Sequence, residues 1–309
     1  MKYDIQLTLS PQDAANEAVI IQTIQEKLAL PKELPVQFRF RKKSLDARRK
    51  NIHVVLHMEV YVDEQLPQSS ILFHEQLVSH AEEVHIIGAG PAGYFCALQC
   101  IELGLKPIVF ERGKAVRERR RDLAILNKEG ILNEESNYCF GEGGAGTYSD
   151  GKLYTRSNKR GNTQRVLDLF HFFGADENIL YETHPHIGTN KLPQIIEAMR
   201  QKIIACGGEI HFESKLTDLQ DVSDRITSIT INTNEKVHVK NLVLATGHSA
   251  RDIFELLHHK HILIEAKPFA LGVRIEHPQT LIDSIQYHCK DRGVFLPPAS
   301  YNLVEQVNS

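Results

Sequence analysis

The feature that most constrains the fold of this chain is a glycine-rich turn between an apolar segment and a helical one. Residues 83–87 form a short β-like run, Gly88, Gly90 and Gly93 follow with GxGxxG spacing, and a helix is expected to about Leu103. In such a turn the first glycine permits the sharp reversal, the second lets a pyrophosphate approach the backbone, and the third lets helix and strand pack closely. The pattern therefore predicts a phosphate-binding turn.

The residues around this turn extend the prediction to a dinucleotide. Pro91 and Ala92 open the helix, whose free N–H groups attract phosphate. The next expected strand, 107–111, ends in Glu111, which we expect to accept hydrogen bonds from the adenosine ribose. A carboxylate there disfavours the 2′-phosphate of NADP. A glycine-rich turn without a ligand is the alternative interpretation.

The rest of the chain predicts an α/β protein in three parts. Residues 1–80 have a β-α-β-β pattern typical of a small α+β, ferredoxin-like module, with a helix from Ser10 to about Leu28. Residues 81–265 predict a Rossmann-like domain with a parallel sheet, an antiparallel hairpin crossover and an insertion at about 155–190. Residues 266–309 are expected to begin a second, incomplete domain.

Composition narrows the class of protein. The net charge is −3, which argues against nucleic acid as a partner, although the basic stretch 39–50 is either a solvated hairpin or a polyanion contact. Five cysteines without a CxxC pair argue against a disulfide framework and a zinc site, so no metal is predicted. No segment is long and apolar enough for a membrane span, and no signal peptide is recognised, so a cytoplasmic protein is expected.

Several longer motifs resemble those of one group of proteins, the bacterial FAD-dependent dehydrogenases or oxidoreductases among the flavoproteins with two dinucleotide domains. The motifs are 111–113, 140–153, 184–189, 245–252 and 272–279. The resemblance implies FAD bound through the glycine turn, Glu111 and the strand end at Thr246 and Gly247. Glycine-rich loops expose N–H groups that bind anions, so the second loop is assigned to the cofactor through Gly143, Gly144, Ala145 and Gly146.

Charged side chains near these motifs give further candidates. Arg112 and Arg119 are expected to contact the pyrophosphate, and Lys152, His186 and Arg274 to face a substrate. No catalytic side chain is assigned, because a flavin carries the hydride or electrons itself.

The sequence thus predicts an FAD-dependent oxidoreductase with a small organic substrate and a nicotinamide or another electron donor. The alternatives are an NAD-dependent dehydrogenase with a single Rossmann site, a flavoprotein associated with RNA, and a binding module without catalysis. Members of the resembling group continue past the segment similar to 296–304 to a Gly-Asp motif that holds the flavin, and no such motif follows Gly247 here. We therefore expect a C-terminally truncated chain with an incomplete flavin half-site.

Overall fold

The structure is a computed structural model of the chain. It describes residues 1–49, 51–67, 73–149, 151–153, 155, 161–188, 190–223, 225–268, 272–273 and 275–301. The chain forms two compact units. The first contains Met1–Ser70, Leu180–Pro185 and Pro268–Ser309, and the second contains Ile71–Ile179 and His186–Lys267.

This division differs from the boundaries expected near residues 80 and 265. Residues 73–80 belong to the second unit, where Val78 is buried and donates its N–H to Cys206 O at 2.8 Å. The expected strand at 269–275 lies largely outside the described residues.

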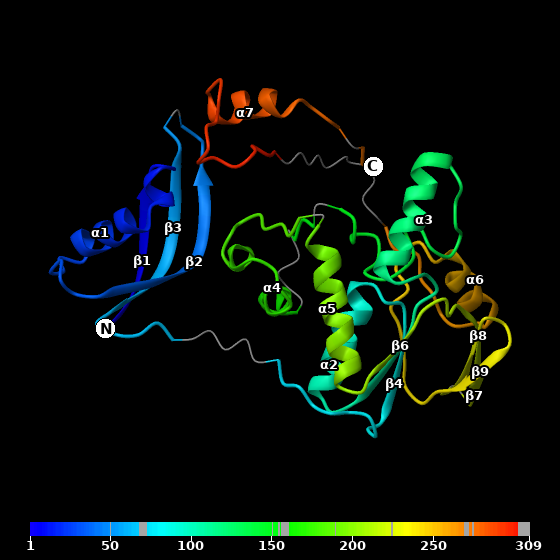
Figure 1. Cartoon of the computed structure of the whole chain (residues 1–309). Coiled ribbons are helices and arrows are strands. Elements are labelled where there is room, and N and C mark those ends of the chain that lie inside the picture. The colour runs from blue at the N-terminus through cyan, green and yellow to red at the C-terminus, as the bar shows by residue number, and fades with distance from the viewer. Residues whose placement is uncertain are drawn as a thin grey trace. The chain divides into compact units, whose positions relative to one another are not determined.

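The N-terminal module of the first unit is a three-stranded antiparallel sheet with one helix. Strand β1 (Lys2–Leu9) and β2 (Val36–Asp46) flank β3 (His53–Val62), and α1 (Glu17–Lys27) connects β1 to β2 (Figure 1). Side chains that alternate along β3 face a core shared with α1, because successive strand residues point to opposite faces. This is the arrangement of a split β-α-β unit.

The expected helix start in this module is wrong by several residues. Ser10 Oγ accepts the Asp13 N–H, but only a short 3₁₀ turn, η1 (Asp13–Ala15), follows there. The α-helix begins afterwards, where Asn16 Oδ1 accepts the Ala18 N–H at 3.1 Å. Both Ser and Asn are favourable caps, and the sequence alone does not show which of the two starts the longer helix.

Most of the basic stretch 39–50 lies within β2, which ends at Asp46, and not in the connection between two strands. Two of its arginines pair with carboxylates of the same module: Arg41 with the buried Glu59 at 2.5 Å, and Arg48 with Asp46 at 2.6 Å. Lys50 lies outside the described residues. Part of the positive charge of this stretch is therefore balanced within the chain.

The second unit is built on a four-stranded parallel sheet of order β10-β4-β5-β6. Its strands are β4 (Glu83–Ile87), β5 (Lys106–Phe110), β6 (Glu209–His211) and β10 (Leu242–Leu244). Helix α2 (Pro91–Glu102) crosses from β4 to β5 (Figure 1). The strand order reverses between β4 and β10, which is where parallel sheets of this kind bind ligands. The expected Rossmann-like parallel sheet is confirmed.

A second, antiparallel sheet covers part of this unit. It contains β7 (Leu216–Val222), β8 (Arg225–Ile231) and β9 (Glu235–His238), and with α6 (Arg251–His259) it shares a hydrophobic core with β4 and β5. The expected hairpin is β8 and β9. Strand β7 was not expected, because it contains two aspartates, which are depleted in strands.

The remaining helices are α3 (Val116–Glu129), α4 (Thr163–Phe172), η2 (Glu177–Leu180), α5 (Leu192–Ala205) and α7 (Gln279–Tyr287). The last of them begins after Pro278. Within the described part of the chain, none of the helices combines the length and apolarity that crossing a bilayer requires.

A buried histidine on β4 predicts how stability depends on pH. His85 is 3% exposed, its Nδ1 has no hydrogen-bond partner among the described residues, and its ring stacks on Phe110. Burial lowers the pKa of His85 from 6.5. Between the two pKa values His85 is therefore protonated in the unfolded chain and neutral in the folded chain. The free energy of unfolding should fall as the pH drops below about 6.5, because protonation favours the unfolded chain.

We expect His85→Gln to reduce this acid sensitivity, measured by urea unfolding between about pH 5 and pH 8. The exposed His238 on β9 offers a matched control, and His238→Gln should keep the wild-type pH profile. An unchanged profile in His85→Gln would show that another group is responsible.

Candidate functional site

A crevice opens at the carboxyl ends of β4 and β10, where the strand order reverses. Its volume is about 520 Å³. The turn at residues 87–92 and the segment 244–250 form two of its walls, and residues 139–145 and the apolar side chains of α6 form the others. Both glycine-rich segments predicted from the sequence therefore border one cavity.

Two of the three fingerprint glycines are required by the packing of the chain itself. Gly88 has a φ of +107°, and a Cβ on it would lie 2.5 Å from Ala245 O. A Cβ on Gly93 would lie 1.9 Å from Gly88 O, so only glycine lets α2 pack this closely on β4.

Gly90 differs from these two, because no protein atom excludes a Cβ there. Its φ is −77°, and the nearest atom to an added Cβ is Gly144 Cα at 3.8 Å, an ordinary contact distance. Gly90 lines the crevice. The space above it is therefore open to a ligand.

Backbone N–H groups supply the polar lining near Gly90. Among the described residues, no hydrogen bond uses the N–H of Gly90, Ala92 or Ala145, all of which border the crevice. The glycine loop is held against the turn, since Gly143 donates its N–H to Ala89 O at 2.8 Å. Free N–H groups from two segments thus line the same cavity, as anion-binding sites require.

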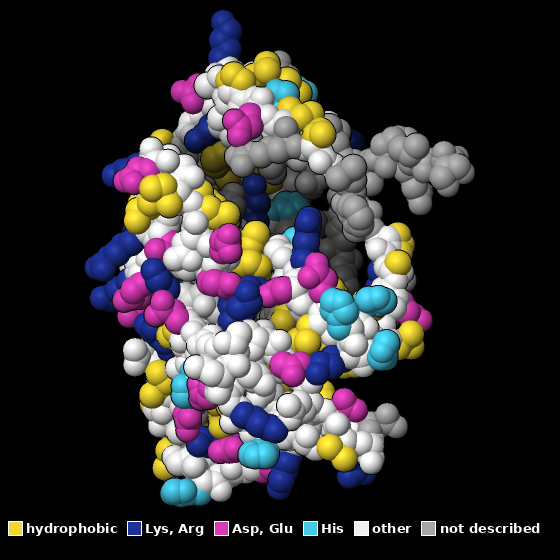
Figure 2. All heavy atoms as spheres, turned by 90° about the vertical axis from the view of Figure 1, so that its right-hand side faces the viewer, with side chains coloured by type: hydrophobic (Ala, Val, Ile, Leu, Met, Phe, Trp, Pro, Cys, Tyr) yellow, Lys and Arg dark blue, Asp and Glu magenta, His cyan; other side chains and the backbone are white. Residues whose placement is uncertain are grey.

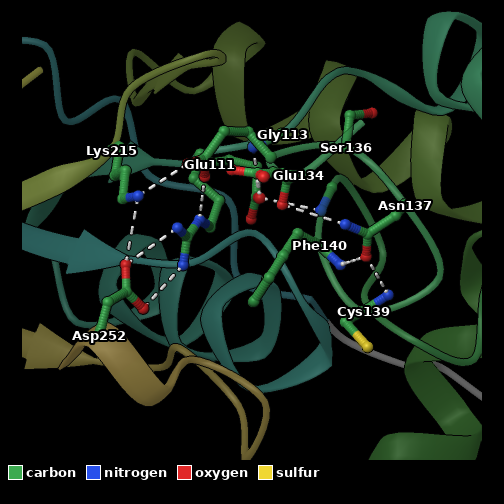
Figure 3. Close-up of polar contacts among 12 residues, drawn as sticks. Glu111, Gly113, Glu134, Ser136, Asn137, Cys139, Phe140, Lys215 and Asp252 are labelled. Atoms are coloured by element: carbon green, nitrogen blue, oxygen red, sulfur yellow. Dashed lines mark hydrogen bonds and ion pairs between the residues drawn. The ribbon is translucent and has the colours of Figure 1, made fainter. Parts of the chain in front are cut away.

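Glu111, at the end of β5, is 5% exposed, and its carboxylate binds three backbone N–H groups. Figure 3 shows it beside one of these, Gly113. Its Oε2 accepts from Ala89 at 2.7 Å, and its Oε1 accepts from Gly113 at 2.8 Å and from Gly141 at 3.0 Å. A carboxylate has about four acceptor sites, so about one remains on Oε2. The ribose contact stays a prediction, and the structure adds a role in joining three segments.

Arg112 lies at the crevice wall within a cluster of four charges. Its side chain contacts Glu135 at 2.5 Å and Asp252 at 2.9 Å, and its guanidinium stacks 4.2 Å from the centre of the Phe140 ring. Lys215 pairs with the same two carboxylates, at 2.7 Å and 3.4 Å, and Figure 3 shows it facing Asp252. The pyrophosphate contact of Arg112 stays a prediction, and its charge is balanced within the cluster.

Arg119, the second arginine assigned to the pyrophosphate, lies beneath the glycine loop and not in the crevice. It is 0% exposed, and its guanidinium donates only to protein oxygens. The acceptors are the carbonyls of Asn137, Tyr138, Gly141, Glu142 and Gly144 and the hydroxyl of Thr147. All three guanidinium nitrogens donate to the loop, so in this structure Arg119 holds the loop. It is not among the residues that line the crevice, and its pyrophosphate contact stays a prediction.

The other assigned residues fall in several places. Thr246 and Gly247 line the crevice with Gly144 and Ala145. Gly143 packs against Thr147 and Ile196. Neither Gly143 nor Gly146 is among the residues that line the crevice.

Two residues assigned to the substrate are brought together. Lys152 and His186 form an isolated antiparallel bridge, although 34 positions separate them, and the neighbouring Ile187 donates its N–H to Gly151 O at 3.0 Å. Arg274 lies outside the described residues.

The sequence did not reveal the apolar wall of the crevice or a second, polar cavity beside it. Phe254 and Leu257 of α6 line the crevice, and their spacing of three on an amphipathic helix was the available signal. The second cavity, of about 380 Å³, lies next to Arg112 and Lys215, and the buried Ser136 Oγ on its wall has no hydrogen-bond partner among the described residues.

Histidines gather on one exposed face, which Figure 2 shows together with interspersed acidic and basic side chains. His258 and His259 are exposed, with ring centres 6.2 Å apart. Within the ranges that the structure describes, no group of three or more His, Cys, Asp or Glu side chains is placed to hold a metal ion.

The parallel sheet, the position of the crevice and the N–H-lined turn define a Rossmann-like dinucleotide-binding domain. Two family models match the ends of the chain. Residues 1–61 match a domain of unknown function, DUF8436, and residues 268–309 match a family described as FAD-dependent protein, C-terminal domain-like. The second match agrees with the resemblance to FAD-dependent proteins.

A relative from Clostridium beijerinckii, described as an uncharacterized protein, is 38% identical over 316 residues. The alignment covers 97% of this chain and 58% of the relative. The chain thus spans little more than half the length of that relative.

Several solved structures resemble part of the chain at low sequence identity, among them the following three. The THI4 protein of Thermovibrio ammonificans has 16% identity and a TM-score of 0.36, covering 60% of this chain and 64% of that one. An L-amino acid deaminase from Proteus vulgaris has 12% identity and a TM-score of 0.31, covering 56% and 48%. A ferredoxin reductase from Rhodopseudomonas palustris has 14% identity and a TM-score of 0.26, covering 54% and 24%. The fold assignment rests on the strand order of the chain itself.

Glu111→Gln tests whether the carboxylate joins the three segments. A carboxamide presents one oxygen and one NH₂ group, so at least one of the three buried N–H groups loses its acceptor. We expect the free energy of unfolding to fall by about 1–3 kcal/mol, measured by urea unfolding, with faster hydrogen exchange at the amide that loses its acceptor.

The exposed Glu118 in the first turn of α3 provides the control. Glu118→Gln should lower the free energy of unfolding by at most about 1 kcal/mol, from its interaction with the helix dipole, and leave the exchange of the Ala89, Gly113 and Gly141 amides unchanged. Wild-type stability and exchange in Glu111→Gln would contradict the role assigned to the carboxylate.

Proposed function

We propose that this chain binds FAD in the crevice at the ends of β4 and β10, as the cofactor-binding part of an oxidoreductase that acts on a small organic substrate. The observation that carries the proposal is the open space above Gly90, bordered by the unpaired N–H groups of Gly90, Ala92 and Ala145. A diphosphate needs both a close approach to the backbone and several N–H donors.

The residues of the crevice fit the remaining parts of the cofactor. Glu111 keeps about one acceptor site for a ribose hydroxyl, and such hydrogen bonds to a charged group contribute about 1.5–3 kcal/mol. Arg112 and Phe140 offer flat surfaces at the crevice wall, and Thr246 and Gly247 also line the crevice.

FAD is favoured over NAD by the glycine loop. In this chain the loop packs on the phosphate-binding turn through Gly143 and adds the N–H of Ala145 to the crevice. A single Rossmann site for NAD does not need this second wall. The match of residues 268–309 to an FAD-dependent C-terminal domain supports the same choice.

When bound, a flavin supplies hydride or electron transfer, and the protein contributes binding, orientation and electrostatics. We assign the substrate contact to Lys152 and His186, because the bridge between them places a cation and an imidazole on neighbouring backbone positions. A nicotinamide or another donor would deliver the electrons.

Gly90→Val tests the proposed site. The φ of Gly90 is allowed for every residue, so the variant should fold normally, while its side chain fills the space of the diphosphate. We expect FAD to bind about 10- to 100-fold more weakly, since overpacking costs about 1–3 kcal/mol. The measurement is calorimetric titration of the purified chain with FAD, and urea unfolding checks the fold.

Gly93→Ala is the contrasting variant. Its Cβ would collide with Gly88 O, so it should lower the stability of the chain even without a ligand. Equal FAD affinity in wild type and Gly90→Val would place the diphosphate elsewhere, and a wild-type chain that binds neither FAD nor ADP would overturn the proposed function.

A further inference from the structure

Arg119 carries a buried charge that no acidic side chain contacts directly. Its guanidinium donates to Glu142 O at 2.7 Å, Gly144 O at 2.8 Å and Asn137 O at 3.0 Å, and all of these acceptors are neutral. The Tyr148 ring adds a contact 5.4 Å from the guanidinium carbon. Among the described residues, Arg119 forms no ion pair. Burying a cation in this way is costly unless its charge interacts favourably with another group.

Two buried carboxylates act on Arg119 through space, and both are engaged elsewhere. Glu111 binds the N–H groups of Ala89, Gly113 and Gly141. Glu142 is 0% exposed; it accepts from Tyr94 Oη at 2.6 Å and Val116 N at 2.7 Å, and Arg200 lies 3.4 Å away. Glu142 thus has its own cation.

Glu111, in contrast, has no basic side chain among its described hydrogen-bond partners. Its Oε2 binds the N–H of Ala89, within the turn that is proposed to receive the diphosphate. An anionic ligand at this turn meets a buried negative charge. A buried positive charge nearby is needed to offset that repulsion.

Arg119 lies close enough to the crevice to do so. Its Nη1 binds Gly144 O, and Gly144 itself lines the crevice opposite Gly90. One residue of backbone therefore separates the guanidinium from the space above the turn. Interactions between charges are stronger in a protein interior than in water.

We propose that Arg119 is a positioning residue for a diphosphate group. It fixes the glycine loop in its binding conformation before the ligand arrives, and from beneath the loop it supplies the positive charge that offsets Glu111. This inference rests on the proposed function, because it takes the crevice to bind a dinucleotide. The planar fork of arginine suits both tasks, whereas lysine offers the charge without the fork.

The test compares ligands of increasing phosphate charge. Wild type, Arg119→Met, Arg119→Lys and the control Arg120→Met, an exposed position on the same helix, are titrated calorimetrically with adenosine, AMP and ADP. In Arg119→Met we expect ADP to bind about tenfold more weakly and adenosine at most about twofold more weakly. The reason is that only ADP loses an interaction between its phosphates and the buried guanidinium. Arg120→Met should match the wild type.

Arg119→Lys separates the charge from the fork. It should keep the wild-type preference for ADP over adenosine, while hydrogen exchange of the Gly141 and Gly143 amides becomes faster because the loop loses several of its hydrogen bonds. This variant also serves if Arg119→Met does not fold. Wild-type exchange at these two amides, or loss of the ADP preference, would overturn the inference.

Two further outcomes distinguish the inference from the proposed function. An equal loss of affinity for all three ligands in Arg119→Met, or no loss for ADP, leaves Arg119 a purely structural residue. If the wild type binds none of the three ligands, the proposed function itself fails.

Discussion

The second unit depends on one buried carboxylate. Glu111 accepts backbone N–H groups from the turn after β4, from its own strand end and from the glycine loop, which are far apart in the sequence. Hydrogen bonds to a charged group contribute more than neutral ones. The same side chain therefore binds the backbone just after β5 at Gly113, holds Ala89 in the turn and holds the start of the glycine loop at Gly141. The walls of the crevice are set relative to one another within this unit.

Around this carboxylate the chain uses buried polar groups instead of apolar packing to shape the glycine loop. Arg119 binds its carbonyls from beneath, Glu142 ties it to α2 and α3 through Tyr94 and Val116, and Gly143 binds the turn directly. Glycine-rich segments lose much conformational entropy on folding. A loop held by so many hydrogen bonds has already lost this conformational entropy before a ligand binds. Ligand binding to such a preformed site therefore costs less free energy of ordering.

The sequence allowed the β4–turn–α2–β5 unit to be predicted because its signals are local: an apolar run, glycine spacing and a strand-terminal acid. The role of Arg119 in holding the loop could not be predicted, since five arginines lie from position 112 to position 121 and only the fold shows which one is fully buried. Likewise, Ser10 and Asn16 are equally good helix caps, and β7 lacks a clear strand pattern. Such choices depend on contacts between distant segments, which a pattern in one segment does not contain.

The glycines of the turn show how packing and ligand recognition are separated within one motif. Gly88 and Gly93 are required by neighbouring backbone atoms, so replacing them disturbs the fold whatever the crevice binds. Gly90 has room for a Cβ, and the cluster of Arg112, Lys215 and their two carboxylates is balanced in charge. In the proposed function, recognition at the described crevice would therefore fall to backbone N–H groups and to the space above Gly90. In the proposed site, the close approach of the ligand to the chain and the buried charge of Arg119 would act together.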